Sequence, residues 1–337
     1  MKNGSLLKEN QLKGFMKMYD LKDLKEKINI TETTVECPVK DCDVIVERQR
    51  KSFKREERFY CPKHKIYISP STFVYQNESD NFLWENRDDM ELLKKIKTVK
   101  RESRMARDNS EDSLSWNVFR FLEKDQLLEK VMEATLGVPI KSPEIIYWSY
   151  SQKDETGWPA LNDAREYFGE KIRRGSEPDI IIKSENALFF IEAKLTASNK
   201  TTPTNLDDAK KYEERDKDYY SQIFKADLNT VAVQMKKYEL LRFWLLGNWI
   251  AKEKNLYFYL IDLVLEEKDQ DIESTFGQLI KQDKNKRFIR ITWEDIYEQI
   301  LNHGTSLNDS NKIIEYFKNK TIGYNGYGKL QKAFSIV

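Results

Sequence analysis

The stretch Gly175–Leu195, GSEPDIIIKSENALFFIEAKL, decides how we interpret the fold. Two apolar runs, DIIIK and ALFFIEAKL, flank the polar residues SEN, which is the pattern of a β-hairpin. Because side chains alternate between the two faces of a strand, Glu192 and Lys194 share one face of the second run. The hairpin therefore predicts two charged side chains on an otherwise apolar strand, next to Asp179 on the partner strand.

These charged side chains are expected to have a partner or a task. Charges beside an apolar core are costly unless they are paired or bind a metal ion. Two carboxylates, from Asp179 and Glu192, together with a strand carbonyl form a hard oxygen site suited to Mg²⁺ or Mn²⁺. Lys194 could activate a water molecule or stabilise charge on a phosphate, which are the parts needed to hydrolyse a phosphodiester bond. The alternative is a plain strand ion pair with Asp179 as a turn cap.

The surrounding pattern predicts an α/β fold. A helix is expected to start at Asn109-Ser110, with Ser110 as its N-cap. Five runs of strand length follow, EIIYWSY, DIIIK, ALFFIEAKL, LYFYLIDLV and RFIRITW, with an amphipathic helix at about 230–249 between the third and fourth. The order is helix, three strands, helix, strand. A polar, partly helical insertion covers 196–228, and the last run leads into a helix capped at Thr292 as an edge addition to the sheet.

The residues Pro178-Asp179 and Glu192-Ala193-Lys194, in this hairpin, resemble the PD-(D/E)XK nuclease superfamily. The resemblance covers about 110–264 and implies the restriction-endonuclease-like fold, with an αβββαβ core. It also implies metal-dependent cleavage of DNA. In that reading Asp179 and Glu192 hold Mg²⁺ or Mn²⁺, and Lys194 activates the attacking water.

The resemblance suggests two further site residues. The first helix of the superfamily often carries another metal-linked acid, and Glu111 is the best match, although four other acids remain rivals. RecB-type members carry a Q-x3-Y motif in the helix after the hairpin, and Gln234-Met-Lys-Lys-Tyr238 is similar to it. A four-residue spacing would place Gln234 and Tyr238 on one helical face. The rival acids are Glu133, Glu166, Glu170 and Glu177.

A second constellation lies near the N-terminus, where all three cysteines of the chain precede a histidine in the pattern C-x4-C-x18-C-x2-H. Zinc prefers four tetrahedral sulfur or nitrogen ligands, and four protein ligands leave no position open for substrate. We therefore predict a structural zinc ribbon, against the alternatives of unrelated buried cysteines or a disulfide scaffold. The ligands would be Cys37, Cys42, Cys61 and His64.

These features predict three regions. A short helix would occupy 1–30, the zinc-ribbon module 31–76, and the nuclease-like domain 77–337, with its insertion and a C-terminal extension. The longest apolar stretches are too short for a membrane span, and the first residues do not have the apolar core of a signal peptide. We therefore expect a soluble, cytoplasmic protein with no membrane contact.

The charge balance first argues against a nucleic-acid partner. Lys and Arg number 57 against 56 Asp and Glu, a formal net charge of +1. The basic residues are concentrated, however: the window 44–65 has eight against three acidic ones, and the window 90–107, within an expected helix at 88–107, has seven against two. These discrete patches favour a nuclease that contacts double-stranded DNA at specific surfaces over a protein that binds DNA through its overall charge.

Three functions remain in view at this stage. The first is a metal-dependent DNA endonuclease of the restriction or phage-defence type. The second is a RecB-like exonuclease or end-processing nuclease. The third is a catalytically inactive zinc-ribbon DNA-binding protein on a nuclease fold. An RNA substrate and a homodimer stay open.

Overall fold

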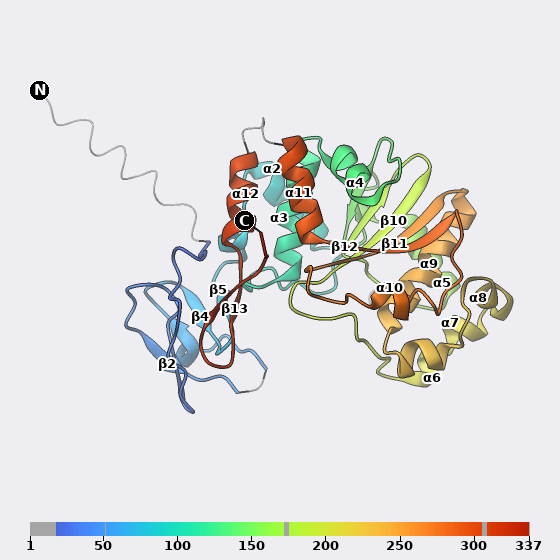
Figure 1. The fold of residues 1–337 in the computed structure, drawn as a ribbon. Coiled ribbons are helices and arrows are strands. Elements are labelled where there is room, and N and C mark those ends of the chain that lie inside the picture. Colours follow the sequence, from blue (N-terminus) through green and yellow to red (C-terminus); the bar gives the residue numbers. More distant parts are fainter. Residues whose placement is uncertain (1–17, 51, 172–174, 305–308, 337) are drawn as a thin grey trace, which may run out of the picture. The chain divides into compact units, whose positions relative to one another are not determined.

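The computed structural model describes residues 18–50, 52–171, 175–304 and 309–336 of the 337-residue chain. The chain divides into two compact units, which Figure 1 shows in ribbon form. We call them the ribbon unit and the sheet unit. The expected boundary near residue 76 is close to the end of the first segment, but the chain returns to the ribbon unit twice. The ribbon unit comprises Met1–Leu83, Arg104–Ser113 and Asn319–Ala333; the sheet unit comprises Trp84–Ser103, Leu114–Lys318 and Phe334–Val337.

The ribbon unit is built from short antiparallel strands. Strands β2, β3 and β4 lie around the turns that carry the cysteines. β1 pairs with β2, β4 lies between β3 and β5, and β13 pairs with β14. The bounds are β1 Thr34–Glu36, β2 Ile45–Glu47, β3 Tyr60–Cys61, β4 Ile66–Ile68, β5 Phe73–Tyr75, β13 Thr321–Tyr324 and β14 Leu330–Lys332.

The helix expected over residues 1–30 is wrong for the part that the structure describes, and residues 1–17 lie outside it. Residues 18–30 form turns and isolated bridges. Backbone amides of this segment bond to distant parts of the chain. The amide of Lys25 donates to the Pro38 carbonyl at 2.8 Å, and the amide of Ile28 donates to the Gly328 carbonyl at 2.9 Å. Leu24 and Ile28 are buried in the same apolar cluster as the cysteines.

The sheet unit contains a mixed seven-stranded sheet, mostly antiparallel, in the order β12-β11-β10-β9-β6-β7-β8. β10 is antiparallel to β9 and parallel to β11, which is parallel to β12. The predicted order of helix, three strands, helix, strand is present as α3, β6, β9, β10, α9 and β11, and β12 is the predicted edge addition. The bounds are β6 Glu144–Tyr147, β7 Tyr150–Ser151, β8 Thr156–Gly157, β9 Ile180–Lys183, β10 Ala187–Ala193, β11 Tyr257–Val264 and β12 Lys286–Thr292.

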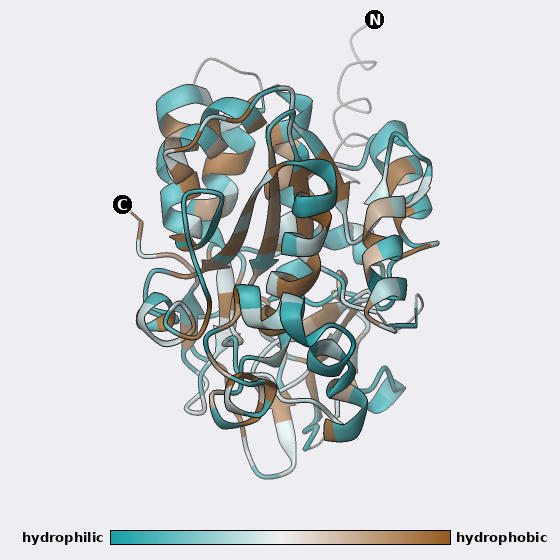
Figure 2. Cartoon of the chain, turned by 90° about the vertical axis from the view of Figure 1, so that its right-hand side faces the viewer, coloured by the Kyte–Doolittle hydropathy of each residue, from teal (hydrophilic) through white to brown (hydrophobic). Residues whose placement is uncertain are grey.

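Helices cover both faces of this sheet, whose strands are the hydrophobic centre of the unit in Figure 2. One face, which includes Leu188, Phe190 and Phe258, packs against α5, α8 and α9. The opposite face carries α3, α4 and α11, where Phe119 meets Trp293 edge-on. The bounds are α3 Glu111–Lys124, α4 Leu128–Leu136, α5 Pro159–Tyr167, α8 Lys217–Ile223, α9 Tyr238–Lys254 and α11 Trp293–Gly304.

The remaining helices are short. The predicted partly helical insertion is confirmed as α6, α7 and α8. The basic helix expected to reach Arg107 ends at Ile96, because the next residues turn and the amide of Arg101 donates to the Glu177 carboxylate at 3.2 Å. None of the helices in the described part of the chain combines the length and apolar character needed to cross a bilayer. The bounds are α2 Arg87–Ile96, α6 Leu206–Ala209, α7 Lys211–Glu214, α10 Ile272–Thr275 and α12 Ser310–Asn319.

The helix expected over about 230–249 is not continuous. A π-helical turn, Thr230–Gln234, is followed by Lys236 in the left-handed region at φ 55°, and α9 begins only at Tyr238. The backbone of Thr201 bonds to both sides of this break. Its amide donates to the Lys236 carbonyl at 2.7 Å, and its carbonyl accepts from the Tyr238 amide at 3.1 Å. Gln234 and Tyr238 therefore do not share one helical face, which corrects the sequence-based expectation.

Candidate active site and metal centre

The hairpin β9–β10 aligns the predicted carboxylates in one row. The antiparallel pairing of the two strands, continued by one residue beyond β9, places Asp179 opposite Glu192. The amide of Ala193 donates to Asp179 Oδ2 at 2.9 Å, which fixes that carboxylate at the end of the hairpin. On its other side Glu192 is paired in register with Asp262 of β11. Three carboxylates thus lie side by side across the sheet, on the face that α9 covers.

Lys194 closes the site from the end of β10. Its ammonium group contacts the Glu192 carboxylate and lies 3.2 Å from Glu239 Oε2. Its backbone is fixed on both sides: the amide donates to the Leu263 carbonyl at 2.8 Å, and the indole N–H of Trp293 donates to its carbonyl at 3.0 Å. These backbone hydrogen bonds place Lys194 beside Glu192.

The electrostatics of the cluster favour binding a cation. Burial raises the pKa of Glu192 well above its usual range, and the charges of Asp179 and Glu239 raise it further. Burial alone would raise the pKa of Glu239 too, but the charges of Lys194 and Arg242 outweigh it and lower that pKa. The cluster thus contains more carboxylates than cations. An added proton on Glu192, or a divalent cation, would relieve the repulsion.

Glu239 is a site residue that sequence reasoning missed. It lies in the first turn of α9, where its amide donates to the Thr201 hydroxyl at 2.8 Å. An acid in a first turn is ordinary helix chemistry, so it gave no special signal. The expected continuous helix also directed attention to Gln234, which is exposed in the π-helical turn. The break that displaces Gln234 is the same one that starts α9 at Glu239.

Asp262 was missed as well, although it is the only charged residue in the run LYFYLIDLV. It is fully buried, and the side-chain amide of Asn199 donates to its Oδ1. Within the described residues, its Oδ2 has no hydrogen-bond partner. Burial raises the pKa of Asp262 to about 7, with a further contribution from the Asp269 carboxylate. Asp262 therefore extends the acidic row beyond Glu192.

The upstream acid has a less defined place. Glu111 opens α3 and is half-buried, in the part of that helix that belongs to the ribbon unit. Of its rivals, Glu133 accepts from a backbone amide, Glu170 binds a serine and a tyrosine, and Glu166 is exposed. Glu177 precedes Asp179 by two residues and is 3.8 Å from a lysine ammonium.

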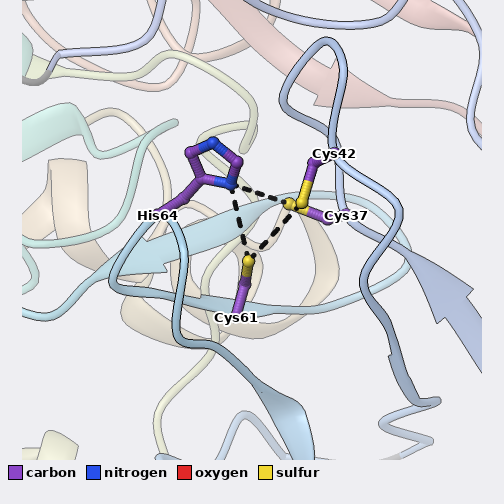
Figure 3. Close-up of side chains that lie close together, drawn as sticks. All are labelled: Cys37, Cys42, Cys61 and His64. Carbon is purple, nitrogen blue, oxygen red and sulfur yellow. Dashed lines mark hydrogen bonds between the residues drawn. The ribbon is translucent and has the colours of Figure 1, made fainter.

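The ribbon unit brings the four predicted zinc ligands together, as Figure 3 shows. Their ligand atoms all lie within 4.8 Å of one another. The Cys42 and Cys61 sulfurs are 3.8 Å apart, and His64 Nδ1 lies 3.7 Å from the Cys37 sulfur and 3.5 Å from that of Cys61. Bond lengths of about 2.3 Å to sulfur and 2.0–2.1 Å to nitrogen in a tetrahedron require about 3.8 Å between sulfurs and about 3.6 Å from sulfur to nitrogen. The cluster is thus compatible with a small zinc site.

Two tight turns produce this convergence. The Cys37–Cys42 turn joins β1 to β2, and Asp41 adopts a left-handed φ of 56° just before the second cysteine. In the turn between β3 and β4, the amide of Lys65 donates to the Cys61 carbonyl at 2.8 Å, and Lys65 has a φ of 55°. Left-handed residues close a turn sharply, which aims both pairs of ligands at one point.

The basic windows face outward only in part. In the ribbon unit Arg58 pairs with Glu56 at 2.7 Å, and Lys63 pairs with Asp43, so acids offset some of the exposed bases. Lys51 lies outside the described residues. In the second window the Lys100 side chain is only 5% exposed and is therefore internal. The exposed positive charge of the two windows is therefore smaller than their sequence composition suggests.

The comparisons with known proteins extend this picture. A family model described as restriction endonuclease associating with ARP matches residues 40–320. No curated protein and no solved structure matches the chain. The matched range contains the whole hairpin site and three of the four Cys/His ligands, with Cys37 just before it. Because the match spans most of the chain, this protein belongs to the family of restriction endonucleases associating with ARP.

Proposed function

We propose that the protein is a metal-dependent DNA endonuclease of the restriction type. The observation that supports this most directly is the convergence of Asp179, Glu192 and Lys194 at the end of one hairpin, within a chain of a restriction-endonuclease family. We assign Asp179 and Glu192 as ligands of Mg²⁺ or Mn²⁺, and Lys194 as the group that activates water. Glu111 is proposed as an accessory acid.

The residues present fit a hard divalent cation, since carboxylate oxygens are its preferred ligands. Bound there, the ion would lower the pKa of an attacking water and stabilise charge on the scissile phosphate. The amide of Ala193 holds Asp179 Oδ2 in place, so that the carboxylate needs no reorientation. When a cation engages Glu192, the Lys194 ammonium would still be held by Glu239, from where it can donate a hydrogen bond to the attacking water and stabilise the hydroxide that forms.

We also propose that Cys37, Cys42, Cys61 and His64 bind Zn²⁺ structurally, because the four ligand atoms would complete its tetrahedron. The Lys and Arg side chains of the ribbon unit that remain exposed would then contact the phosphates of double-stranded DNA. The exonuclease alternative loses its main support, since Gln234 is not on the helix that lines the site.

The test is the incubation of supercoiled plasmid with wild-type protein and either Mg²⁺, Mn²⁺ or EDTA. Conversion to nicked and linear forms is expected only with metal, while activity restricted to linear DNA would indicate an exonuclease. Asp179→Asn and Lys194→Met should each lower the rate by at least about 100-fold, because each removes a group that acts on the reacting atoms. Lys183→Met is the matched control, since Lys183 lies on β9 with its ammonium 4.0 Å from Glu144.

Undiminished cleavage by both site variants would contradict the assignment. DNA binding by the wild type without any metal-stimulated cleavage would favour the third alternative, an inactive DNA-binding protein. Substituting RNA for the plasmid determines which nucleic acid is the substrate.

A further inference from the structure

We propose that Trp148 is a positioning residue that orients Asp179 for metal binding. We further propose that Lys100, from the second basic window, acts on Trp148. This inference rests on the proposed function of the hairpin site. It is carried by the backbone of the β6–β7 turn, by a hydrogen bond to Asp179 and by a cation over the indole ring.

The first observation is backbone strain. Trp148 and Ser149 form the two-residue turn between β6 and β7, closed by the pair Tyr147 and Tyr150. Both turn residues are left-handed, with φ of 43° at Trp148 and 75° at Ser149. Turns of this kind normally use Asn-Gly, because a large L-residue is disfavoured at positive φ. A tryptophan held there by its surroundings indicates a functional constraint.

The second observation is where the indole points. Its Nε1 donates to Asp179 Oδ1 at 3.2 Å, while the Ala193 amide donates to Oδ2 at 2.9 Å. Each carboxylate oxygen therefore accepts from a donor of fixed position, which sets the orientation of the carboxylate plane. The Trp148 amide also donates to the Asp179 carbonyl at 3.1 Å, so backbone and side chain of the aspartate are both held by one residue.

The turn itself is held by hydrogen bonds to Ser149. The side chain of Arg165, which is 3% exposed, donates to the Ser149 hydroxyl at 2.8 Å and to the Ser176 carbonyl. The Trp158 amide donates to the Ser149 carbonyl at 2.7 Å. These bonds tie the strained turn to the segment that leads into Asp179. The same hydrogen-bonded framework therefore holds both the indole and the carboxylate.

The third observation comes from the segment after α2. The Lys100 ammonium lies 4.4 Å from the centroid of the Trp148 ring and 3.8 Å from Glu177 Oε1. A buried cation over the ring draws on its π electrons and makes the indole N–H a stronger donor. Lys100 thus acts on Asp179 through Trp148. This lysine of the second basic window therefore has a role other than contact with DNA phosphates.

A residue that positions a metal ligand should change metal affinity more than folding. Partners of this kind typically contribute about 10- to 100-fold to metal affinity. Trp148→Phe removes the N–H donor and keeps an aromatic ring for Lys100. Lys100→Met removes the cation and keeps the donor, so its effect should be smaller, about two- to fivefold, and Lys100→Arg should restore affinity.

The experiment measures Mn²⁺ dissociation constants of the full chain, with the zinc site loaded, from the electron paramagnetic resonance signal of free Mn²⁺. Trp148→Phe is expected to weaken binding by about tenfold. Because the substitution truncates a fully buried side chain, its melting temperature should fall, and the dissociation constant is measured well below that temperature, where the variant is folded. In plasmid cleavage the Mg²⁺ concentration for half-maximal rate should rise similarly, with little change at saturating metal. Trp249→Phe is the matched control, because Trp249 lies on α9, stacks on Tyr167 with centroids 5.1 Å apart and packs against the apolar core.

A Mn²⁺ affinity of Trp148→Phe within twofold of both wild type and control would overturn the inference, even if the wild type cleaves DNA. A wild type that binds no Mn²⁺ would overturn it too. If the wild type binds Mn²⁺ but does not cleave, the proposed function fails while the affinity ratio still decides the role of Trp148. If Trp148→Phe does not fold, Lys100→Met and its arginine rescue decide the matter through the same dissociation constants.

Discussion

The Cys/His cluster and the hairpin site are built in opposite ways. All four ligands of the cluster come from residues 37–64, on two local turns. The hairpin site draws Asp179, Glu192 and Lys194 from two strands, Glu239 from a helix and its alignment from a seven-stranded sheet. The Cys/His cluster lies at the centre of the small ribbon unit. The hairpin site, in contrast, is positioned by the large apolar core of the sheet unit.

This difference predicts where each unit is vulnerable. The ribbon unit has strands of two to four residues and a small apolar cluster that includes the cysteines themselves. Such a unit has little hydrophobic stabilisation of its own, so its fold should depend on the metal. The sheet unit buries strands such as Ala187–Ala193 completely, and its fold should survive the loss of any one site residue.

The largest expected effect is therefore loss of zinc. Chelation, or Cys61→Ser, should unfold the ribbon unit while the sheet unit keeps its own transition, because structural zinc contributes on the order of 10 kcal/mol to small domains. Hydrogen exchange compares the amides of β4 with those of β10 before and after chelation, alongside zinc content. Exchange in β4 that stays slow in metal-free protein would show that the two units do not differ in this way.

The second effect concerns a buried acid of the sheet unit. Because burial raises the pKa of Asp262 to about 7 in the folded state, the fold binds a proton that the unfolded chain releases near pH 4. Stability is thus lost as pH rises from about 4 to 7, by up to about 4 kcal/mol. Asp262→Asn should remove this loss, so the variant gains on the wild type at pH 8 but not at pH 4.

Urea unfolding in EDTA at the two pH values measures this difference. Asp218→Asn, at an exposed position of α8, controls for the loss of one negative charge. Equal effects of Asp262→Asn at both pH values would mean that the acid is not protonated in the fold.

A smaller effect is expected at Glu239. Glu239→Gln keeps the shape of the side chain but removes the charge that holds Lys194, and DNA cleavage should fall by about 10- to 100-fold. That is less than the loss in Asp179→Asn, since Glu239 acts through Lys194. Plasmid cleavage rates are compared with those of Glu253→Gln, an exposed acid near the end of the same helix. A rate equal to that of the control would remove Glu239 from the site.

The contrast also explains what the sequence could predict. Local patterns were sufficient for the cysteine turns, for the β9–β10 hairpin and for the cap at Thr292, because neighbouring residues determine each of them. The helix expected at 1–30 failed because its amides bond to distant segments, among them the carbonyl of Gly328. The break before α9 depends on Thr201, more than thirty residues earlier in the chain. Glu239 joins the site through the placement of α9, and Asp262 joins the acidic row through strand register, neither of which a hydrophobic pattern encodes.

The smallest effect tests how evenly the sheet unit distributes its stability. At the start of α11, Asp295 donates its amide to the Thr292 hydroxyl at 2.9 Å, and its carboxylate accepts from the Thr292 amide at 2.8 Å. This is a reciprocal cap, so Thr292→Ala should lower the free energy of unfolding of the sheet unit by about 1 kcal/mol. Urea unfolding should show this shift and no change in the ribbon transition.

The double variant Thr292→Ala/Asp295→Ala makes that test specific. Because the two residues satisfy each other, its cost should be less than the sum of the single costs, a coupling that a double-mutant cycle measures directly. Strict additivity would mean that the two hydrogen bonds act independently. A cost of several kcal/mol from Thr292→Ala alone would mean that the sheet unit, like the ribbon unit, depends on a single local feature, and the contrast between the two units would then no longer hold.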